Sequence, residues 1–575
     1  MDSISPDYPF RNGQLSNRTI KMKDLTPHIM ESYLQGKPLR KEEKMKKKIL
    51  YVLLGLIIAI SMGSGIQIVP RPAVAEEATF FPPAPSPVPS LKGMGRYIPG
   101  GRNVQAHRYV HSKGYPPFPD RARFIGALTG SWYEIGVQFG QRSGDETRCV
   151  SDIWWKDECD MFGKEETLKA MALYEAQIAA LDPDLLQFMR GIADGAAPWL
   201  SQSQYADPNH PLHATNYQRV LAVNIWDEWA MLHPCEFPDG SSTFGGTEKG
   251  PPVTGVVGCS AFAAHGGATL DGRMIAAHNR HIPYDPRSYE QVYITKPATG
   301  NSCWVLTNCP QVAANQVVNE RGLSLILLFG GVSNPKSWEH PGGPYFAEGF
   351  GVPWFHLFLY VGTHADNAKE AIEMLTVGTP EYCARTGRKS LLRGGGWIFL
   401  VSDRDTLAVV EATADRYAVR YPGEFTPGWT SSDYIVSTNH FLCDFSYDKH
   451  SNRTNVPLTM FNVLPLSDVR FWTLMWDMKH NYGHIDKYMA QHIMSGLYGY
   501  DKDTGERIDC AERDGKWRLY GEVKACTVGT EVGLIGGSSD CKVAVLDGSR
   551  SEVYWTMGNA SDWEGAWDAY FFSEQ

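Results

Sequence analysis

Apolar side chains recur at helical spacing in the part of the chain that precedes residue 251. Within residues 163–204, leucine, methionine and isoleucine return every three or four positions, and Pro183 interrupts the run. This period places the apolar side chains on one face of a helix, and a proline inside such a pattern ends or kinks the helix. The pattern therefore predicts two helices in this region, and a similar run predicts a further helix over 214–233.

The pattern changes at Pro251 to short runs of β-branched and aromatic residues separated by glycine. Runs of this kind predict strands, and they lie at 256–264, 274–279, 291–296, 303–307 and 323–329. The remaining sequence predicts a helix over 366–376, strands at 397–402, 407–412 and 417–420, helix over 467–497 and a last pair of strands within 542–556. Separate blocks of helices and of strands predict an α+β fold rather than alternating strand–helix units.

The N-terminal region has the composition of a targeting sequence followed by a linker. Lysines at 46–48 precede an apolar run over 49–69, and Ala-Val-Ala follows at 73–75. A basic segment, an apolar segment and a small-x-small site form a secretory signal peptide, so we expect export to the periplasm or the cell exterior. The apolar run is also nearly long enough to span a bilayer, and the alternative is an uncleaved anchor that would tether the protein to a membrane. We assign 1–75 to this extension and 76–120 to a proline-rich linker.

Composition adds two constraints. The 575 residues are 43% hydrophobic, which is enough for a large core, and the net charge of -10 excludes the basic footprint of a nucleic-acid-binding protein. All eleven cysteines follow the apolar run, and an odd number leaves at least one thiol unpaired within the chain. An oxidising compartment permits disulfides, although their connectivity cannot be deduced and buried thiols are the alternative. The spacings that suit short-loop disulfides are Cys149/Cys159, Cys303/Cys309 and Cys510/Cys526.

One cysteine stands where a nucleophile could cleave its own chain. Cys259 opens a predicted core strand and follows directly on a segment rich in proline and glycine that ends at Gly258. A thiol at this place could attack the preceding carbonyl, and the freed α-amine could then act as its general base. The pKa of an α-amine is about 7.7–8.0, close enough to neutrality for it to accept a proton. The alternative is a buried or disulfide-bonded cysteine in an ordinary strand.

Five short motifs follow one another along the chain. They are Gly130-Ser131-x-x-Glu134-x-Gly136-x-x-x-Gly140; the segment 258–262 with 271–273 and 278–281; Asn319-Glu-Arg-Gly322-Leu323 within 315–323; 438–441; and 467–471. In this order they resemble motifs of the acyl-coenzyme A:6-aminopenicillanic acid acyltransferase family, the C45 autoproteolytic peptidases, which are N-terminal-nucleophile enzymes. The resemblance extends from about residue 121 to the C-terminus.

The resemblance implies a four-layer αββα sandwich of the N-terminal-nucleophile hydrolase type. It also implies cleavage between Gly258 and Cys259, which would give an α chain over 121–258 and a β chain over 259–575. Cys259 would then attack a linear amide or related acyl bond of a small-molecule substrate, and Asn439 would donate its side-chain amide to the oxyanion. Water as the second reactant gives a hydrolase and an amine gives an acyltransferase, and neither needs a metal or an organic cofactor. Candidate substrate-binding residues are Arg280, Asp285, His440 and Arg470.

The cluster His278-Asn279-Arg280-His281 departs from the family's usual Arg-Asn-x-Asp. His278 stands in place of the arginine and His281 in place of the aspartate, while Asn279 fits, and these three are further catalytic candidates. Arg280 or Asp285 could substitute for the aspartate that holds the nucleophile's amine. The cluster is also similar to the phospholipase-B-like branch of the superfamily, so a lipid hydrolase is an alternative function.

Two other classes of protein remain open. His265, His278 and His281 could supply three imidazoles to a catalytic zinc, although positions i and i+3 of a strand point to opposite faces. A non-catalytic exported binding protein could line its cleft with some of the 17 tryptophans. A binding protein has no need of self-cleavage, so self-cleavage discriminates between these classes.

Overall fold

The structure is a computed structural model in which the chain is divided into two units, Met1–Phe81 and Pro82–Gln575. All described residues belong to the second unit, and the regions predicted as extension and linker lie outside them. The described residues are 123–231, 258–281, 290–329, 350–414, 417–424, 431–442, 467–494, 498–500, 504–505, 507–513, 516–519, 539–547, 550–556 and 568–571. Within these ranges no helix is long and apolar enough to cross a membrane.

A helical segment follows the first strand. Its elements are β2 (Arg123–Gly130), α3 (Trp132–Arg142), α4 (Gly144–Phe162), α5 (Lys164–Leu181), α6 (Pro183–Gly195), α7 (Ala197–Leu200) and α8 (Asn216–Met231). Ser131 and Glu134 form a capping box that starts α3. Asp182 accepts a hydrogen bond from Asp184 N and caps α6, so Pro183 stands at the first helical position, where its missing N–H is harmless. The predicted division of this region into two helices at Pro183 is confirmed.

Helices α3 and α6 pack with their backbones in close approach. A Cβ added to Gly140 would lie 2.3 Å from Ile192 O, and one added to Gly195 would lie 2.2 Å from Val137 O. Gly136 and Gly191 show the same relation on the neighbouring turn. The glycines of the first motif at 136 and 140 are therefore explained by a close contact between the backbones of two helices.

An eight-stranded sheet has the order β11-β10-β9-β8-β7-β6-β5-β2. The strands after β2 are β5 (Glu290–Pro297), β6 (Cys303–Asn308), β7 (Gln316–Asn319), β8 (Ser324–Phe329), β9 (Trp397–Ser402), β10 (Leu407–Ala412) and β11 (Tyr417–Arg420). Neighbours are antiparallel except β2, which pairs parallel to β5 at the edge.

A six-stranded antiparallel sheet has the order β12-β3-β4-β16-β17-β18. Its strands are β12 (Tyr434–Ser437), β3 (Gly258–Ala264), β4 (Met274–His281), β16 (Ser539–Leu546), β17 (Glu552–Thr556) and β18 (Asp568–Phe571). A three-stranded sheet contains β13 (Tyr498–Tyr500), β14 (Arg507–Arg513) and β15 (Lys516–Leu519).

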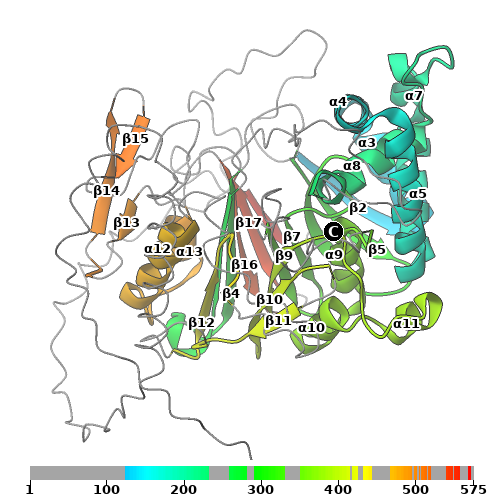
Figure 1. The fold of residues 1–575 in the computed structure, drawn as a ribbon. Coiled ribbons are helices and arrows are strands. Elements are labelled where there is room, and N and C mark those ends of the chain that lie inside the picture. Colours follow the sequence, from blue (N-terminus) through cyan, green and yellow to red (C-terminus); the bar gives the residue numbers. More distant parts are fainter. Residues whose placement is uncertain are drawn as a thin grey trace, which may run out of the picture. The chain divides into compact units, whose positions relative to one another are not determined.

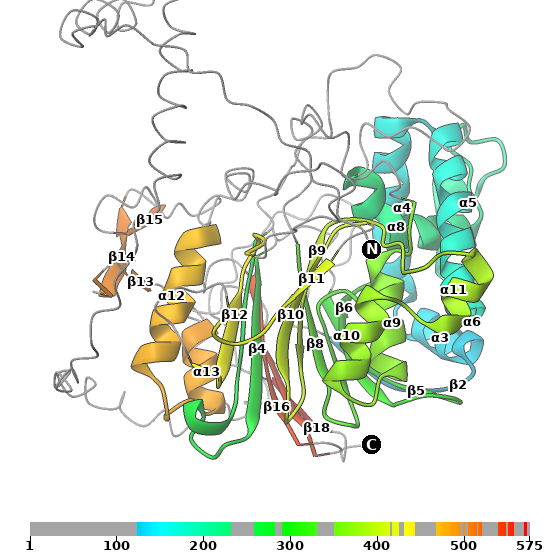
Figure 2. The ribbon, with the colours of Figure 1, turned by 60° about the horizontal axis from the view of Figure 1, so that its bottom comes forward.

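The two large sheets lie next to each other with helices on their outer faces (Figures 1 and 2). Helices α12 (Ser467–His480) and α13 (Lys487–Met494) cover the six-stranded sheet, and α9 (Trp354–His364) and α10 (Ala368–Thr376) cover the eight-stranded sheet, with α11 (Pro380–Thr386) next in the chain. Side chains of β3 alternate between two cores. Cys259 and Ala261 belong to the core that the sheets share, while Phe262 packs with Leu474 and Ile493 of the outer helices.

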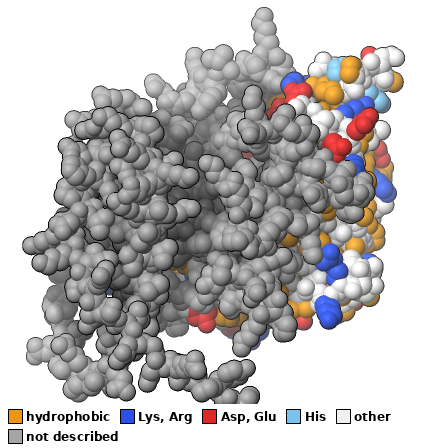
Figure 3. Space-filling view, in the orientation of Figure 1, with side chains coloured by type: hydrophobic (Ala, Val, Ile, Leu, Met, Phe, Trp, Pro, Cys, Tyr) orange, Lys and Arg blue, Asp and Glu red, His pale blue; other side chains and the backbone are white. Residues whose placement is uncertain are grey.

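The predicted α+β class is confirmed, and most predicted strands differ from the observed ones by one or two residues at an end. The helix predicted within 467–497 is present as two helices, and the chain turns between them at Gly483, whose φ is 81°. On the described part of the face in Figure 3, basic and acidic side chains are interspersed over the helical segment.

Candidate active site

Cys259 is the second residue of β3 and is flanked by both neighbours of that strand. Its side chain is 4% exposed and faces the core between the sheets. On one side β4 places Arg280 directly opposite Cys259, and on the other side β12 places Ser437 opposite Ala261. The chain beyond Ser437 therefore passes Cys259, which brings the fourth motif to the predicted nucleophile.

Asn439 contacts the backbone nitrogen of Cys259. Asn439 Oδ1 accepts hydrogen bonds from Cys259 N at 2.5 Å and from Arg470 Nη2 at 2.8 Å. A backbone N–H and a guanidinium can only donate, so these two bonds identify this atom as the amide oxygen and orient the Nδ2 group away from the Cys259 nitrogen. This nitrogen is the atom that cleavage would turn into the α-amine.

Arg470 joins the helix layer to the nucleophile strand. Its side chain is fully buried in α12, and Nη1 donates to Cys259 O and, at 2.9 Å, to Ser260 Oγ. Together with the bond to Asn439, the planar guanidinium holds three acceptors in fixed relation. Predicted as a substrate-binding residue, Arg470 instead contacts the scaffold around Cys259.

Arg280 and His278 share the face of the sheet that carries Cys259. Directly opposed residues of an antiparallel pair point to the same side, and Arg280 pairs with Cys259 while His278 pairs with Ala261. His278 is fully buried. Arg280 is partly buried, and its Nη1 atom has no hydrogen-bond partner among the described residues.

Asn279 points away from the thiol. It pairs with Ser260, so its side chain lies on the helix face of the sheet, where Nδ2 donates to Met494 O at 2.8 Å. Asn279, predicted as a catalytic residue, therefore lies on the face of the sheet opposite to the thiol, and the contact that it makes ties β4 to α13.

The remaining predicted site residues are placed as follows. His440 is buried, its Nδ1 lies 3.2 Å from Thr438 Oγ1, and its ring packs against Phe471 with centroids 5.6 Å apart. Gly258 pairs with His281 through the backbone. The side chain of His281 and all of Asp285 lie outside the described residues.

The third motif forms a tight turn beneath α9. Asn319 Oδ1 accepts from Arg321 N and Leu323 N at 3.0 Å each, while Nδ2 donates to Gly362 O and Ala365 O. These four hydrogen bonds use the full capacity of one buried amide, which has two acceptor lone pairs and two N–H donors. Asn319 therefore has a structural task, as do the glycines of the first motif.

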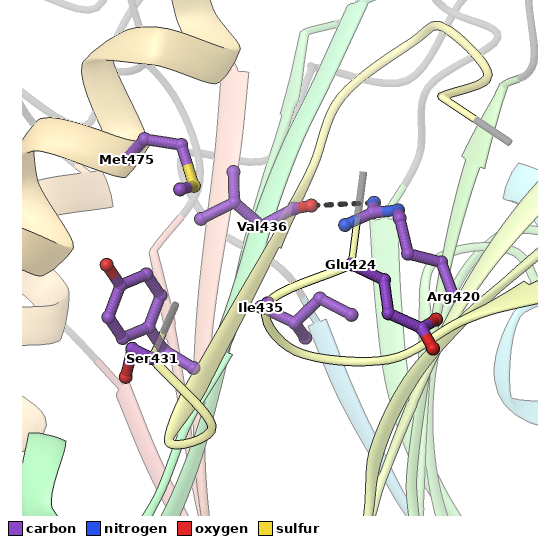
Figure 4. A pocket seen from close by; sticks show the side chains of 8 residues that line it. Arg420, Glu424, Ser431, Ile435, Val436 and Met475 are labelled. Carbon is purple, nitrogen blue, oxygen red and sulfur yellow. Dashed lines mark hydrogen bonds between the residues drawn. The ribbon is translucent and has the colours of Figure 1, made fainter. Parts of the chain in front are cut away.

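Sequence reasoning missed a buried ion pair beside the Asn439 loop. Glu411 in β10 and Arg420 at the end of β11 are joined at 3.4 Å and contact the backbone on either side of Asn439. Both residues lie in short strands and belong to no motif, so nothing in the neighbouring sequence indicates that they form an ion pair near Asn439. Arg420 also lines a pocket between β11, β12 and α12 (Figure 4), whose lining residues do not include Cys259.

The zinc alternative does not fit the strand register. His278 lies opposite Ala261, and His265 lies four residues beyond Ala261, so about 13 Å of strand separates the two histidines. Zinc binds imidazole nitrogens at about 2.0–2.1 Å. Within the described ranges no group of three or more His, Cys, Asp or Glu residues could hold a metal ion.

Two predicted disulfides are absent. Cys149, Cys159, Cys303 and Cys309 are reduced thiols. The first two are ten residues apart in α4, or about 15 Å, and the others lie at opposite ends of β6, about 20 Å apart. A disulfide needs Cα atoms within about 7 Å. Cys526 of the third pair lies outside the described residues.

Comparisons with known proteins give a distant relative and a weak structural likeness. No protein-family model matches the chain. An uncharacterized protein of Archaeoglobus fulgidus is 22% identical over 446 residues. The match covers 71% of this chain but only 65% of the length of the Archaeoglobus protein. A mutant of the conjugated bile acid hydrolase from Clostridium perfringens is similar over 55% of this chain and 93% of that chain, with 11% identity and a TM-score of 0.31. A TM-score of this size does not establish a common fold, so the proposed function is based on the geometry of the site.

Proposed function

We propose that this protein is an exported, autoproteolytic cysteine hydrolase of the N-terminal-nucleophile type, which cleaves a linear amide or related acyl bond. In this proposal the two sheets and their outer helices are the four layers of an αββα sandwich. One observation carries the proposal: Cys259 N donates to Asn439 Oδ1, which Arg470 also binds. The nitrogen that would become the α-amine is thus already held beside an amide side chain suited to an oxyanion.

Self-cleavage would involve Gly258 and Cys259, the first two residues of β3, and one water molecule. Cys259 Sγ attacks the carbonyl carbon of Gly258, the C–N bond breaks, and the Gly258 acyl group passes to sulfur while the nitrogen takes up a proton. Water then hydrolyses this thioester and releases the carboxylate of Gly258. The Cys259 carbonyl, held by Arg470, keeps the strand in place during the exchange.

Turnover would repeat the same chemistry on a substrate. The α-amine removes the thiol proton, sulfur attacks the substrate carbonyl, and Asn439 Nδ2 stabilises the oxyanion. The α-ammonium group then returns the proton to the substrate nitrogen, the C–N bond breaks and the substrate amine leaves. Water completes hydrolysis, and attack by an amine at this stage would make the reaction an acyl transfer. Arg280 favours a substrate with a carboxylate or another anionic group, because it pairs with Cys259 across β3 and β4 and its Nη1 has no hydrogen-bond partner within the described part of the chain.

Intact mass and N-terminal sequencing of the purified protein test the proposal. We expect two fragments, the larger one beginning at Cys259, and a single chain for Cys259→Ala. Cys149→Ala is the matched control, because Cys149 is an equally buried thiol remote from Asn439, and this variant should be cut like the wild type. A single chain in all three proteins would contradict self-cleavage and favour an exported binding protein. Two fragments would justify a screen of N-acyl amino acids and other amides.

A further inference from the structure

Two buried charged side chains hold the loop of Asn439 at both of its ends. Arg420 Nη2 donates to Val436 O at 2.8 Å, as Figure 4 shows, and Glu411 Oε2 accepts from Leu442 N at 2.8 Å. Val436 lies three residues before Asn439 and Leu442 three residues after it. The two anchors are therefore placed symmetrically about the residue that binds the Cys259 nitrogen.

The anchors belong to one ion pair and cross from one sheet to the other. Arg420 Nε lies 3.4 Å from Glu411 Oε1, and the two side chains are 3% and 0% exposed. They project from β10 and β11 of the eight-stranded sheet, whereas Val436 lies in β12 of the six-stranded sheet and the chain over 438–442 continues that strand. Hydrogen bonds to charged groups are about twice as strong as those between neutral groups, and burial protects them from screening by salt.

We propose that the Glu411–Arg420 pair positions Asn439 for the reaction at Cys259, so both members are positioning residues for the oxyanion donor. This inference rests on the proposed function. An oxyanion donor is effective only when it is held in place before charge develops, and a displacement of about 1 Å can reduce the rate about 10²-fold. The pair supplies that restraint on the backbone, while Cys259 N and Arg470 restrain the side chain of Asn439.

The double variant Glu411→Met/Arg420→Met separates positioning from folding. Apolar residues of similar volume often replace a buried ion pair without loss of stability, whereas a single substitution leaves an uncompensated buried charge. The matched control is Asp152→Met/Arg219→Met, which removes an ion pair between a buried arginine and a partly buried aspartate, joined at 2.6 Å, from the helical segment. Thermal unfolding of both variants verifies that each chain is folded.

Backbone hydrogen exchange tests the anchors without reference to catalysis. It is measured by mass spectrometry on chains that also carry Cys259→Ala, so that none of them can be processed. We expect at least 10-fold faster exchange in the peptide over 436–442 for Glu411→Met/Arg420→Met and unchanged exchange there for the control. Unchanged exchange in both would overturn the proposal.

A double-mutant cycle tests whether the pair acts through Asn439. We expect Glu411→Met/Arg420→Met to lower kcat on the best amide substrate about 10²-fold per processed chain, with KM changed less than 3-fold. Added to Asn439→Ala, the same pair of substitutions should lower kcat less than 2-fold further, because the residue that they position is already gone. Losses that multiply would show a general structural role and overturn the inference.

The failure of the proposed function looks different from the failure of this inference. A wild-type protein that is neither cut at Cys259 nor active on amides contradicts the proposed function, and the positioning claim falls with it even if exchange shows that the anchors hold the loop. A wild type that is cut and active, with a variant that retains its kcat, contradicts the positioning claim alone.

Discussion

At the residue scale, the proposed role of Asn439 predicts that loss of its side chain lowers the rate of the reaction without weakening the binding of substrate. We expect Asn439→Ala to lower kcat about 10²- to 10³-fold, as the removal of one oxyanion-hole donor does, with little change in KM. Initial rates on the amide substrate, normalised to the amount of processed chain, provide the measurement.

The matched control for that experiment is Asn319→Ala, which removes an equally buried asparagine whose four hydrogen bonds are all structural. This variant should lose stability while the folded fraction keeps its kcat. Equal losses of kcat in the two variants would contradict the assignment of Asn439 as the oxyanion donor.

The sequence could point to Cys259, Asn439 and Arg470 because each stands in a short motif of its own. It could not show which residues of 278–281 face the thiol. That depends on the register of β3 against β4, and a slip of one residue moves every side chain to the other face. The turn signals between the strands, Gly266-Gly267 and Asp271-Gly272, leave that register open, so the sequence could not show that Asn279 contacts α13.

At the scale of elements, the contact between α3 and α6 depends on the absence of side chains. We expect Gly140→Ala to lower the free energy of unfolding by about 1–3 kcal/mol or more, because the new methyl group would overlap Ile192 O and force the helices apart. Denaturant unfolding of the variant beside Gln141→Ala measures the effect. Gln141 is exposed on the same helix, so its replacement should change stability by less than about 0.5 kcal/mol, and an equal loss in both would refute the close packing.

Helices and strands are predicted correctly where the spacing of apolar residues and the positions of proline or turn residues indicate the same boundaries. Pro183 separates α5 from α6, and the two apolar runs at 397–402 and 407–412, separated by the polar residues Asp403-Arg404-Asp405, match β9 and β10. The helical pattern over 467–497 does not reveal the break between α12 and α13, because its apolar period continues through the turn at Gly483, and a lone glycine inside a helical pattern is tolerated in many helices. The pairing of β2 with β5 joins residues far apart in the sequence, and no local pattern encodes it.

At the scale of the whole molecule, Asp477 makes stability depend on pH. Burial raises the pKa of Asp477 to about 7, although its hydrogen bonds from Tyr498 and Tyr500 and the nearby charge of Arg507 lower it in part. The folded chain therefore retains this proton to about pH 7, while the unfolded chain releases it near the ordinary value of 3.8. The resulting stabilisation is complete below pH 3.8 and is lost as pH rises through 7, a change of at most about 4 kcal/mol.

Asp477→Asn should remove this dependence, because an amide keeps the acceptor for both tyrosines and carries no charge. We expect the variant to have a higher unfolding temperature than the wild type at pH 8 and a similar one at pH 4. Asp433→Asn is a control of opposite sign, since the hydroxyl of Tyr482 holds the pKa of Asp433 below its usual value. Parallel pH profiles for wild type and Asp477→Asn would contradict the buried, protonated carboxyl.

The parallel pairing of β2 with β5 has a consequence for the biosynthesis of this protein. The strand that precedes the proposed cut contributes an edge to a sheet whose other strands all follow it, and Phe139 of α3 packs on Tyr293 of β5 with ring centroids 5.5 Å apart. A cut before Cys259 would turn these contacts into a subunit interface and make unfolding a dissociation that depends on concentration. Two polypeptides translated from separate genes, one ending at Gly258 and one beginning with a methionine before Cys259, would then meet at the same interface. The protein could therefore be reconstituted by complementation, and hydrolytic removal of that methionine would supply the cysteine amine without self-cleavage.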